Sequence, residues 1–148
     1  MKLRASDPWM PAGAYAKTLS GLGVNLLVQS IDIELKFQTD VLNAEIVYSD
    51  PDIAVCRGYG AEWMLHADHT YSDHPLKGSL TDDIARGIGA EIRLYGCDPD
   101  TAEAAARKLN MDVLMGSMDK PHGLREVYLI SPSGYLWVPC IALDEEEK

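Results

Sequence analysis

The sequence predicts an α+β protein that consists of two copies of one βαβββ module. Hydrophobic periodicity gives the same order of five elements, a strand, a helix and three strands, in each half of the 148-residue chain. Residues 42–47 (Leu-Asn-Ala-Glu-Ile-Val) are matched 67 positions later by residues 109–114 (Leu-Asn-Met-Asp-Val-Leu). Trp63 and Trp137 also fall at similar points in the fourth strand of each half. Together these observations indicate an internal duplication.

The first module is predicted to begin with a buried strand and an amphipathic helix. Residues 21–29 are rich in Leu and Val and are bounded by glycine, a pattern typical of a buried strand. Ser30 is a suitable N-cap for a helix over residues 31–43, in which apolar side chains recur at roughly helical spacing. Asp-Pro-Asp and Gly-Tyr-Gly are typical of turns between the strands that follow. These three short strands are expected over residues 45–49, 53–57 and 61–68.

The second module follows a polar linker in which a short helix is expected over residues 81–86. Asp98 is a suitable N-cap, and Pro99 a suitable first residue, for an Ala-rich helix over residues 98–109. The strands of this module are expected over residues 90–95, from 113–116 onward, and over 124–130 and 135–141. The predicted division is an N-terminal extension (1–20), a first module (21–71), a linker (72–88), a second module (89–143) and an acidic tail (144–148), within one domain overall.

Charge and cysteine usage argue against several classes of function. Lys and Arg number 13 against 23 Asp and Glu, and the net charge of −10 disfavours binding to nucleic acid or to an anionic lipid surface. Cys56, Cys97 and Cys140 form no CxxC pair, which indicates neither a disulfide framework nor a zinc site and favours a cytoplasmic location. No apolar run typical of a secretory signal or of a membrane span is present. We therefore expect a protein that is neither exported through a secretory signal nor membrane-spanning.

Two motifs resemble the vicinal oxygen chelate superfamily, which includes glyoxalase I, the bleomycin-resistance proteins, the fosfomycin-resistance enzymes and the extradiol dioxygenases. Residues 28–44, which contain Asp32 and Phe37, resemble the family's passage from first strand to helix, V-x-D-…-FY-…-LG. Residues 123–137 resemble its closing motif, G-x-R-x-F-x-x-x-DP-x-G-x-x-W, with Ser131 in place of the usual Asp. The resemblance extends over residues 21–141, and segments 9–15 and 84–92 are similar to an uncharacterised glyoxalase-like subgroup.

The resemblance implies two half-barrels that enclose one cleft with a ligand inside. Metal enzymes of the family place His, Gln or Glu ligands on the first and fourth strands of each module. The matching positions in this chain are Gly23, Met64 or His66, Glu91 and Val138. Only His66 and Glu91 could bind a divalent metal there, and a stable site needs about three protein ligands plus water. The resemblance therefore implies a lost metal site and no cofactor, with a divalent metal as the alternative.

The candidate ligand-binding residues are those expected to face the cleft: Asn25, Met64, His66, Glu91, Arg93, Tyr95 and Val138. Successive side chains of a strand point to opposite faces, so Glu91, Arg93 and Tyr95 are expected on the same face. Two roles stay open for Glu91, an ion pair with Arg93 or a base, and two for His66, a cleft residue or a structural one. Trp63 and Trp137 have the opposite parity and are expected in the core. No catalytic residue is assigned.

We predict a metal-free small-molecule-binding protein of the bleomycin-resistance type, which sequesters a neutral or zwitterionic ligand in an apolar and aromatic cleft. One alternative is a metal-dependent lyase, isomerase or dioxygenase of the same superfamily. Another is a duplicated module that serves only as a subunit-interaction domain. A homodimer is expected, because open strand edges need cover. Pairing of the modules within one chain and exchange between two chains both stay open.

Overall fold

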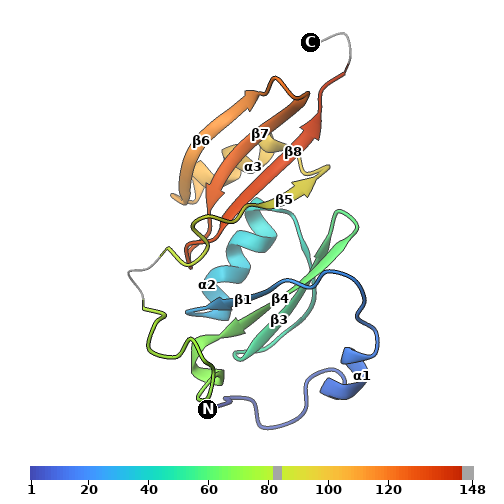
Figure 1. Cartoon of the computed structure of the whole chain (residues 1–148), viewed down its shortest axis with the longest axis vertical. Coiled ribbons are helices and arrows are strands. Elements are labelled where there is room, and N and C mark those ends of the chain that lie inside the picture. Colours follow the sequence, from blue (N-terminus) through green and yellow to red (C-terminus); the bar gives the residue numbers. More distant parts are fainter. Residues whose placement is uncertain (82–84, 145–148) are drawn as a thin grey trace.

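The computed structural model describes residues 1–81 and 85–144, which form two open four-stranded sheets with the main helices packed against them (Figure 1). The predicted α+β class is confirmed. A short helix, α1 (Ala12–Ala16), precedes the first sheet. The first module contains β1 (Asn25–Val28), α2 (Ile31–Lys36), the π-helical turn η1 (Phe37–Val41), β2 (Glu45–Ser49), β3 (Ile53–Gly58), β4 (Ala61–Ala67) and the 3-10 turn η2 (Asp68–Thr70). The second contains β5 (Ile92–Tyr95), α3 (Pro99–Lys108), β6 (Asp112–Asp119), β7 (Leu124–Ile130) and β8 (Leu136–Ala142).

Both sheets have the same topology. Their strand orders are β1-β4-β3-β2 and β5-β8-β7-β6. In each sheet the first strand pairs in parallel with the fourth, and the remaining pairs are antiparallel. In Figure 1 the first sheet occupies the lower half of the molecule and the second sheet the upper half. The order of elements is therefore the repeated one that the sequence predicts.

The repeated Leu-Asn dipeptide ends the helical segment of each module. Asn43 and Asn110 have positive φ angles of 55° and 54°. A residue in the left-handed conformation is the usual way to end a helix, and Asn tolerates this conformation better than most side chains. The repeat seen in the sequence is therefore a pair of equivalent helix stops, each followed closely by the second strand of its module.

The core lies between the helices and the inner faces of the two sheets. Trp63 and Trp137 are buried there with ring centroids 5.6 Å apart, and Phe37 lies 6.3 Å from Trp137. Trp63 also donates a hydrogen bond from Nε1 to Oε1 of the buried Gln38 (2.9 Å). The expectation that both tryptophans belong to the core is confirmed.

Two expected elements differ from the structure by several residues, and a third lies largely outside the described residues. The helix expected over residues 31–43 changes at Phe37 into a π-helical turn, a wider turn that buries Phe37, Gln38 and Val41 together. The first strand begins at Asn25 rather than at Gly21, which has a φ of +71° and cannot continue a strand. The short helix expected over residues 81–86 falls largely on residues 82–84, which are outside the described residues.

Buried polar contacts join the two modules. Glu34 of α2 is fully buried, and its Oε2 accepts a hydrogen bond from the backbone N–H of Ser133 (3.0 Å). The backbone N–H of Gln29 donates to Oγ of Ser133 (3.2 Å). Tyr135 donates from its hydroxyl to the backbone carbonyl of Leu27 (2.7 Å). The turn between β7 and β8 is thus fixed against the first module. Among the described residues, no helix has both the length and the apolar character that a membrane crossing requires.

Candidate binding site on the open face of the first sheet

Strand β4 alternates between the core and the open face of the first sheet. Trp63 and Leu65 are buried in the core, whereas Met64 and His66 point to the opposite face and are half-buried. Asn25 of β1 pairs in register with Met64, which places the two residues side by side. The structure thus brings together three of the residues that the sequence singles out, Asn25, Met64 and His66.

A chain of polar contacts fixes the orientation of His66. Its Nδ1 lies 2.5 Å from Oδ1 of Asn25, and Nδ2 of Asn25 donates to the hydroxyl of Tyr71 (3.2 Å). The Tyr71 ring lies 5.3 Å from the imidazole. Burial lowers the pKa of His66, and the positive charge of Arg4 lowers it further. The imidazole is therefore held neutral at neutral pH.

Residues 1–20 cover part of this open face. Trp9 stacks on Tyr48 of β2 with ring centroids 4.7 Å apart and meets Tyr15 of α1 edge-on at 5.1 Å. Tyr15 donates from its hydroxyl to Glu62 of β4 (2.8 Å). Burial and this hydrogen bond raise the pKa of Tyr15 to about 12, so its hydroxyl keeps its proton. The sequence predicted an N-terminal extension but did not predict that it covers the sheet. The available signal was the presence of two aromatic side chains in a segment that contains Pro and Gly.

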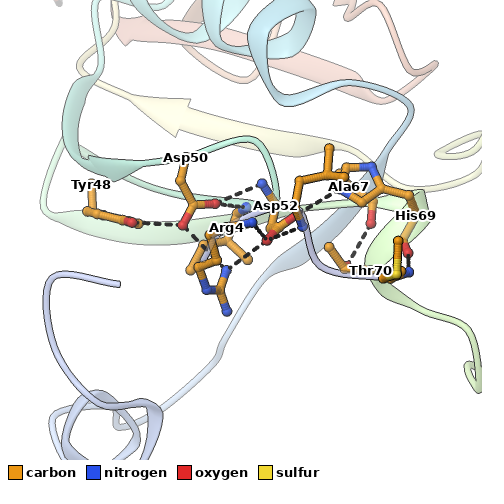
Figure 2. A network of polar contacts seen from close by, with 10 residues as sticks. Arg4, Tyr48, Asp50, Asp52, Ala67, His69 and Thr70 are labelled. Carbon is orange, nitrogen blue, oxygen red and sulfur yellow. Dashed lines mark hydrogen bonds and ion pairs between the residues drawn. The ribbon is translucent and has the colours of Figure 1, made fainter. Parts of the chain in front are cut away.

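A buried carboxylate at the β2–β3 turn anchors the start of the extension (Figure 2). Asp52 is fully buried and accepts hydrogen bonds from the backbone N–H groups of Leu3 (2.7 Å) and Arg4 (3.0 Å). His69 donates to the same carboxylate from Nε2 (2.8 Å). Burial alone would raise the pKa of Asp52, but the hydrogen bonds from Arg4, Leu3 and His69 outweigh it and bring the pKa to about 2. We call Asp52 and these three partners the clamp.

Asp50, on the same turn, adds to the clamp from the side of β2. Figure 2 shows its carboxylate between Tyr48 and Arg4. The Tyr48 hydroxyl donates to it at 2.7 Å, and the Arg4 guanidinium lies 3.4 Å away. Its other oxygen accepts from the backbone N–H groups of Asp52 (2.7 Å) and Ile53 (2.9 Å). The Asp50 carboxylate therefore links the turn, β2 and the extension.

A hollow of about 440 Å³ lies between the extension and the open face. This volume lies within the range of pockets that hold small organic molecules, about 300–1,000 Å³. The lining is mostly apolar or aromatic, with a few polar groups at its edges. We call it the first hollow, and it is lined by Lys2, Arg4, Asp7, Pro8, Trp9, Met10, Ala12, Tyr15, Ala16, Leu19, Ile53, Met64, His66, Thr70 and Tyr71.

Two further hollows continue from the first beside the N-terminal half of β4. The second, of about 660 Å³, shares Tyr15 and Met64 with the first and also contains Asn25. The third, of about 280 Å³, shares Glu62 with the second and reaches β5, where Glu91 and Arg93 line it. The expectation of one cleft lined by all candidates needs correction, because His66 and Glu91 lie in different hollows of this series. His66 lies on β4 of the first sheet, whereas Glu91 lies just before β5 of the second, which separates the candidates.

The open face of the second sheet is occupied by an ion-pair network. Arg93 pairs with Glu91 (2.9 Å) and with Glu126, which is fully buried. His122 (2.7 Å) and the hydroxyl of Tyr128 (3.0 Å) also contact the Glu126 carboxylate. Burial would raise the pKa of Glu126, but hydrogen bonds from His122, Arg93 and Tyr128 outweigh it and lower the pKa. Of the two roles left open for Glu91, the ion pair is the one observed.

The remaining candidates lie on or near this network. Val138 is Arg93's register partner and is fully buried, and it does not line any of the three hollows. Tyr95 is 63 % exposed, with the Arg93 guanidinium 5.9 Å from its ring centroid. Sequence reasoning missed Glu126, although a charged residue in the middle of an apolar strand was a usable signal.

The donor groups do not fit the divalent metal that enzymes of the resembled family hold. Gly23 lies before β1, and the register pairs Asn25 with Met64 and Arg93 with Val138. These four residues offer an amide, a thioether, a guanidinium and an alkyl group, which do not make a site for a divalent cation. The two candidate ligands, His66 and Glu91, lie in different hollows. Within residues 1–81 and 85–144, no group of three or more His, Cys, Asp or Glu side chains is placed to hold a metal ion.

Comparison with solved structures identifies the class of fold. A glyoxalase/bleomycin resistance protein/dioxygenase from Nocardioides superposes with a TM-score of 0.62 at 18 % identity, over 90 % of this chain and 93 % of that one. A glyoxalase-related enzyme from Fulvimarina pelagi gives 0.64 at 13 % identity, over 83 % and 88 % of the two chains. A lactoylglutathione lyase from Agrobacterium tumefaciens gives 0.60 at 16 % identity, over 82 % and 92 %. The chain therefore has the fold of the vicinal oxygen chelate superfamily, as its motifs predicted.

The sequence comparisons add no closer relative. No protein-family model matches the sequence, and no curated protein matches it either. At identities of this size the structural likeness concerns the fold alone, and a fold of this kind hosts many activities. Function must therefore be argued from the hollows and their side chains.

Proposed function

We propose that the protein binds a small organic molecule in the first hollow, without a metal, and that the ligand is neutral or zwitterionic. The observation that carries this proposal is the hollow itself, about 440 Å³ of space under a cover that the chain supplies from its own residues 1–20. Apolar and aromatic lining with a few placed polar groups is the usual composition of a small-molecule site. The role that follows is sequestration, with no chemical step.

The charges around the first hollow support a ligand of low net charge. Lys2 and Arg4 line it together with Asp7, so neither sign dominates. Arg4 is already paired with Asp50 and Asp52, and it offers little to an anion. An uncharged body that gains from apolar burial fits this lining better than a polyanion does.

Blocking the hollow tests the proposal. Met64→Arg would place a long charged side chain on the floor of the hollow, and Met118→Arg, on an exposed part of β6, is the matched control. Isothermal titration with 2-naphthol, a flat aromatic alcohol, should show binding to the wild type and to Met118→Arg. Binding to Met64→Arg should be lost while its circular dichroism spectrum stays native. Equal affinity in both variants would contradict the proposal.

The alternative is a metal-dependent lyase, isomerase or dioxygenase, as found among proteins with this fold. It is separated from the proposal by metal analysis of freshly purified protein. Near-stoichiometric divalent metal that sustains an activity would contradict metal-free binding. Protein that binds 2-naphthol equally well before and after treatment with a chelator would support it.

We also propose that the chain forms a homodimer. The sheets are open, and β2 and β6 are edge strands. An exposed strand edge is an unpaired row of backbone donors and acceptors that a second copy can cover. Sedimentation at micromolar concentration should give about twice the 16.3 kDa of the chain, and a clean monomer would contradict the proposal.

A further inference from the structure

We propose that Nε2 of His66 is a hydrogen-bond acceptor in the first hollow, and that the ligand is a flat apolar molecule that donates an O–H or N–H to it. This inference rests on the proposed small-molecule binding. It adds the direction of the polar contact and the chemical class of the ligand.

The orientation of the Asn25 amide indicates the tautomer of His66. The amide of Asn25 donates from Nδ2 to the Tyr71 hydroxyl, so Oδ1 is the atom that faces Nδ1 of His66. An amide oxygen can only accept, and Nδ1 must therefore carry the proton. A neutral imidazole has one N–H, which leaves a lone pair on Nε2. His66 thus offers an acceptor to the hollow.

No group of the described part of the chain uses this acceptor. Among residues 1–81 and 85–144, the polar contact of the His66 side chain is the one to Asn25, and Nε2 has no hydrogen-bond partner. His66 lines the first hollow and is half-buried. A polar atom in such a position costs free energy if it has no hydrogen-bond partner once a ligand has displaced water from it. A ligand that donates a hydrogen bond removes this cost.

The surroundings keep the imidazole neutral. Burial and Arg4 lower the pKa of His66, whereas the carboxylate of Asp50 opposes them. Lys2 and Asp7 also line the hollow and carry opposite charges. At neutral pH the site therefore presents a lone pair and not an N–H, and it disfavours a carboxylate or phosphate at this point.

The rest of the lining favours a flat hydrocarbon body. Trp9, Tyr15 and Tyr71 contribute aromatic rings, and Ile53 and Met64 contribute apolar floor. Aromatic pairs gain from stacked or edge-on contact in addition to burial. An aromatic alcohol or an N–H heterocycle combines this body with the required donor.

Two matched probes test the direction of the hydrogen bond. 2-Naphthol carries an O–H donor, and 2-methoxynaphthalene is the same body without the donor. Isothermal titration at neutral pH should show that the wild type binds 2-naphthol roughly 3- to 10-fold more tightly, the ratio expected from one hydrogen bond. Equal affinity for the two probes would overturn the inference while leaving small-molecule binding intact.

Two variants and a control sharpen the test. The His66→Leu variant should still bind both probes but should show no preference for 2-naphthol. Asn25→Asp places a carboxylate next to Nδ1, which should raise the pKa of His66 and turn Nε2 into a donor, so that 2-naphthoate gains affinity. His122→Gln, on the second sheet, should behave as the wild type. A preference for 2-naphthol that survives in His66→Leu would overturn the inference.

Nuclear magnetic resonance of the free protein separates failure of the inference from failure of the proposed function. Long-range ¹⁵N–¹H spectra at neutral pH should show His66 protonated on Nδ1 and unprotonated on Nε2. A proton on Nε2 would overturn the inference whatever the probes do. If the tautomer is the expected one but the wild type binds neither probe, the proposed function is contradicted, and the inference fails with it.

Discussion

The open faces of the two sheets are covered in different ways, although the sheets share one topology. On the first sheet, residues 1–20 form a separate cover, held by the clamp, and a hollow of about 440 Å³ lies beneath it. On the second sheet, Arg93 and its partners lie directly on the strands, with Glu126 fully buried among them. A face that is covered from outside can keep space for a ligand, whereas a face covered by its own side chains cannot. The two sheets therefore share a scaffold but differ in their open faces.

The largest effect is expected from removing the buried carboxylate of the second sheet. Glu126→Leu leaves Arg93, 21 % exposed, with Glu91 as its remaining ion-pair partner, and should lower the free energy of unfolding by about 2–3 kcal/mol. Urea denaturation followed by circular dichroism measures this free energy of unfolding. The affinity of the first hollow for 2-naphthol should not change, because Glu126 is part of the other face.

Glu91→Gln is the matched control for this prediction. The Glu91 side chain is 43 % exposed, and water screens its pair with Arg93. We expect a loss of less than about 1 kcal/mol. Similar losses for the two variants would show that burial does not distinguish the two carboxylates, and a fall in 2-naphthol affinity in Glu126→Leu would show that the two faces are coupled.

The next effect concerns the clamp. Asp52→Ala removes the acceptor for the backbone N–H groups of Leu3 and Arg4 and should lower the free energy of unfolding by about 2 kcal/mol. It should also increase proteolysis within residues 1–20 and weaken 2-naphthol binding. Asp73→Asn, at an exposed position, is the control and should change none of these. Native protease resistance in Asp52→Ala would show that the clamp does not hold the cover.

The clamp should also be sensitive to acid. The pKa of Asp52 is about 2 in the folded protein against 3.8 as its ordinary value, so its contribution to stability is complete above pH 4. This contribution is lost as the pH falls from 4 towards 2, because protons then bind the unfolded form more strongly. Hydrogen exchange at the amides of Leu3 and Arg4 should therefore show less protection in this range, after correction for the intrinsic rate. Asp52→Asn should show no such change.

The smallest effect is expected at the rim of the hollow. Trp9→Ala removes the ring that stacks on Tyr48 and should weaken 2-naphthol binding by about 1 kcal/mol. Tyr95→Ala, an exposed aromatic of the second sheet, is the control and should leave the affinity unchanged. Isothermal titration of both variants gives the comparison. A larger loss of affinity in Tyr95→Ala would place the ligand on the second sheet and contradict the prediction.

Most of the fold was predictable because it depends on local patterns. The predicted bounds of β2 and β7 are those observed, since alternating apolar residues and turn-forming segments specify them within a few positions of the chain. The Leu-Asn repeat likewise corresponds to two equivalent helix ends. The parity of β4 placed Met64 and His66 on one face and Trp63 on the other, as expected.

The cover and the buried carboxylate were not predictable in the same way. The contact of Asp52 with Leu3 spans 49 residues, and no local pattern pairs a turn aspartate with a distant backbone N–H. The grouping of the candidates into separate hollows depends on how the two sheets are arranged in space, which periodicity does not report. Alternation along β5 correctly related Glu91 to Arg93, yet the partner Glu126 came from a strand 33 residues away.

Glu34 ties the stability of one half of the chain to the presence of the other. Its carboxylate is fully buried, burial raises its pKa, and its backbone hydrogen-bond donor, Ser133, belongs to the second module. A first module produced alone would have to expose this carboxylate, protonate it or leave it unpaired. The two halves should therefore unfold as one cooperative unit.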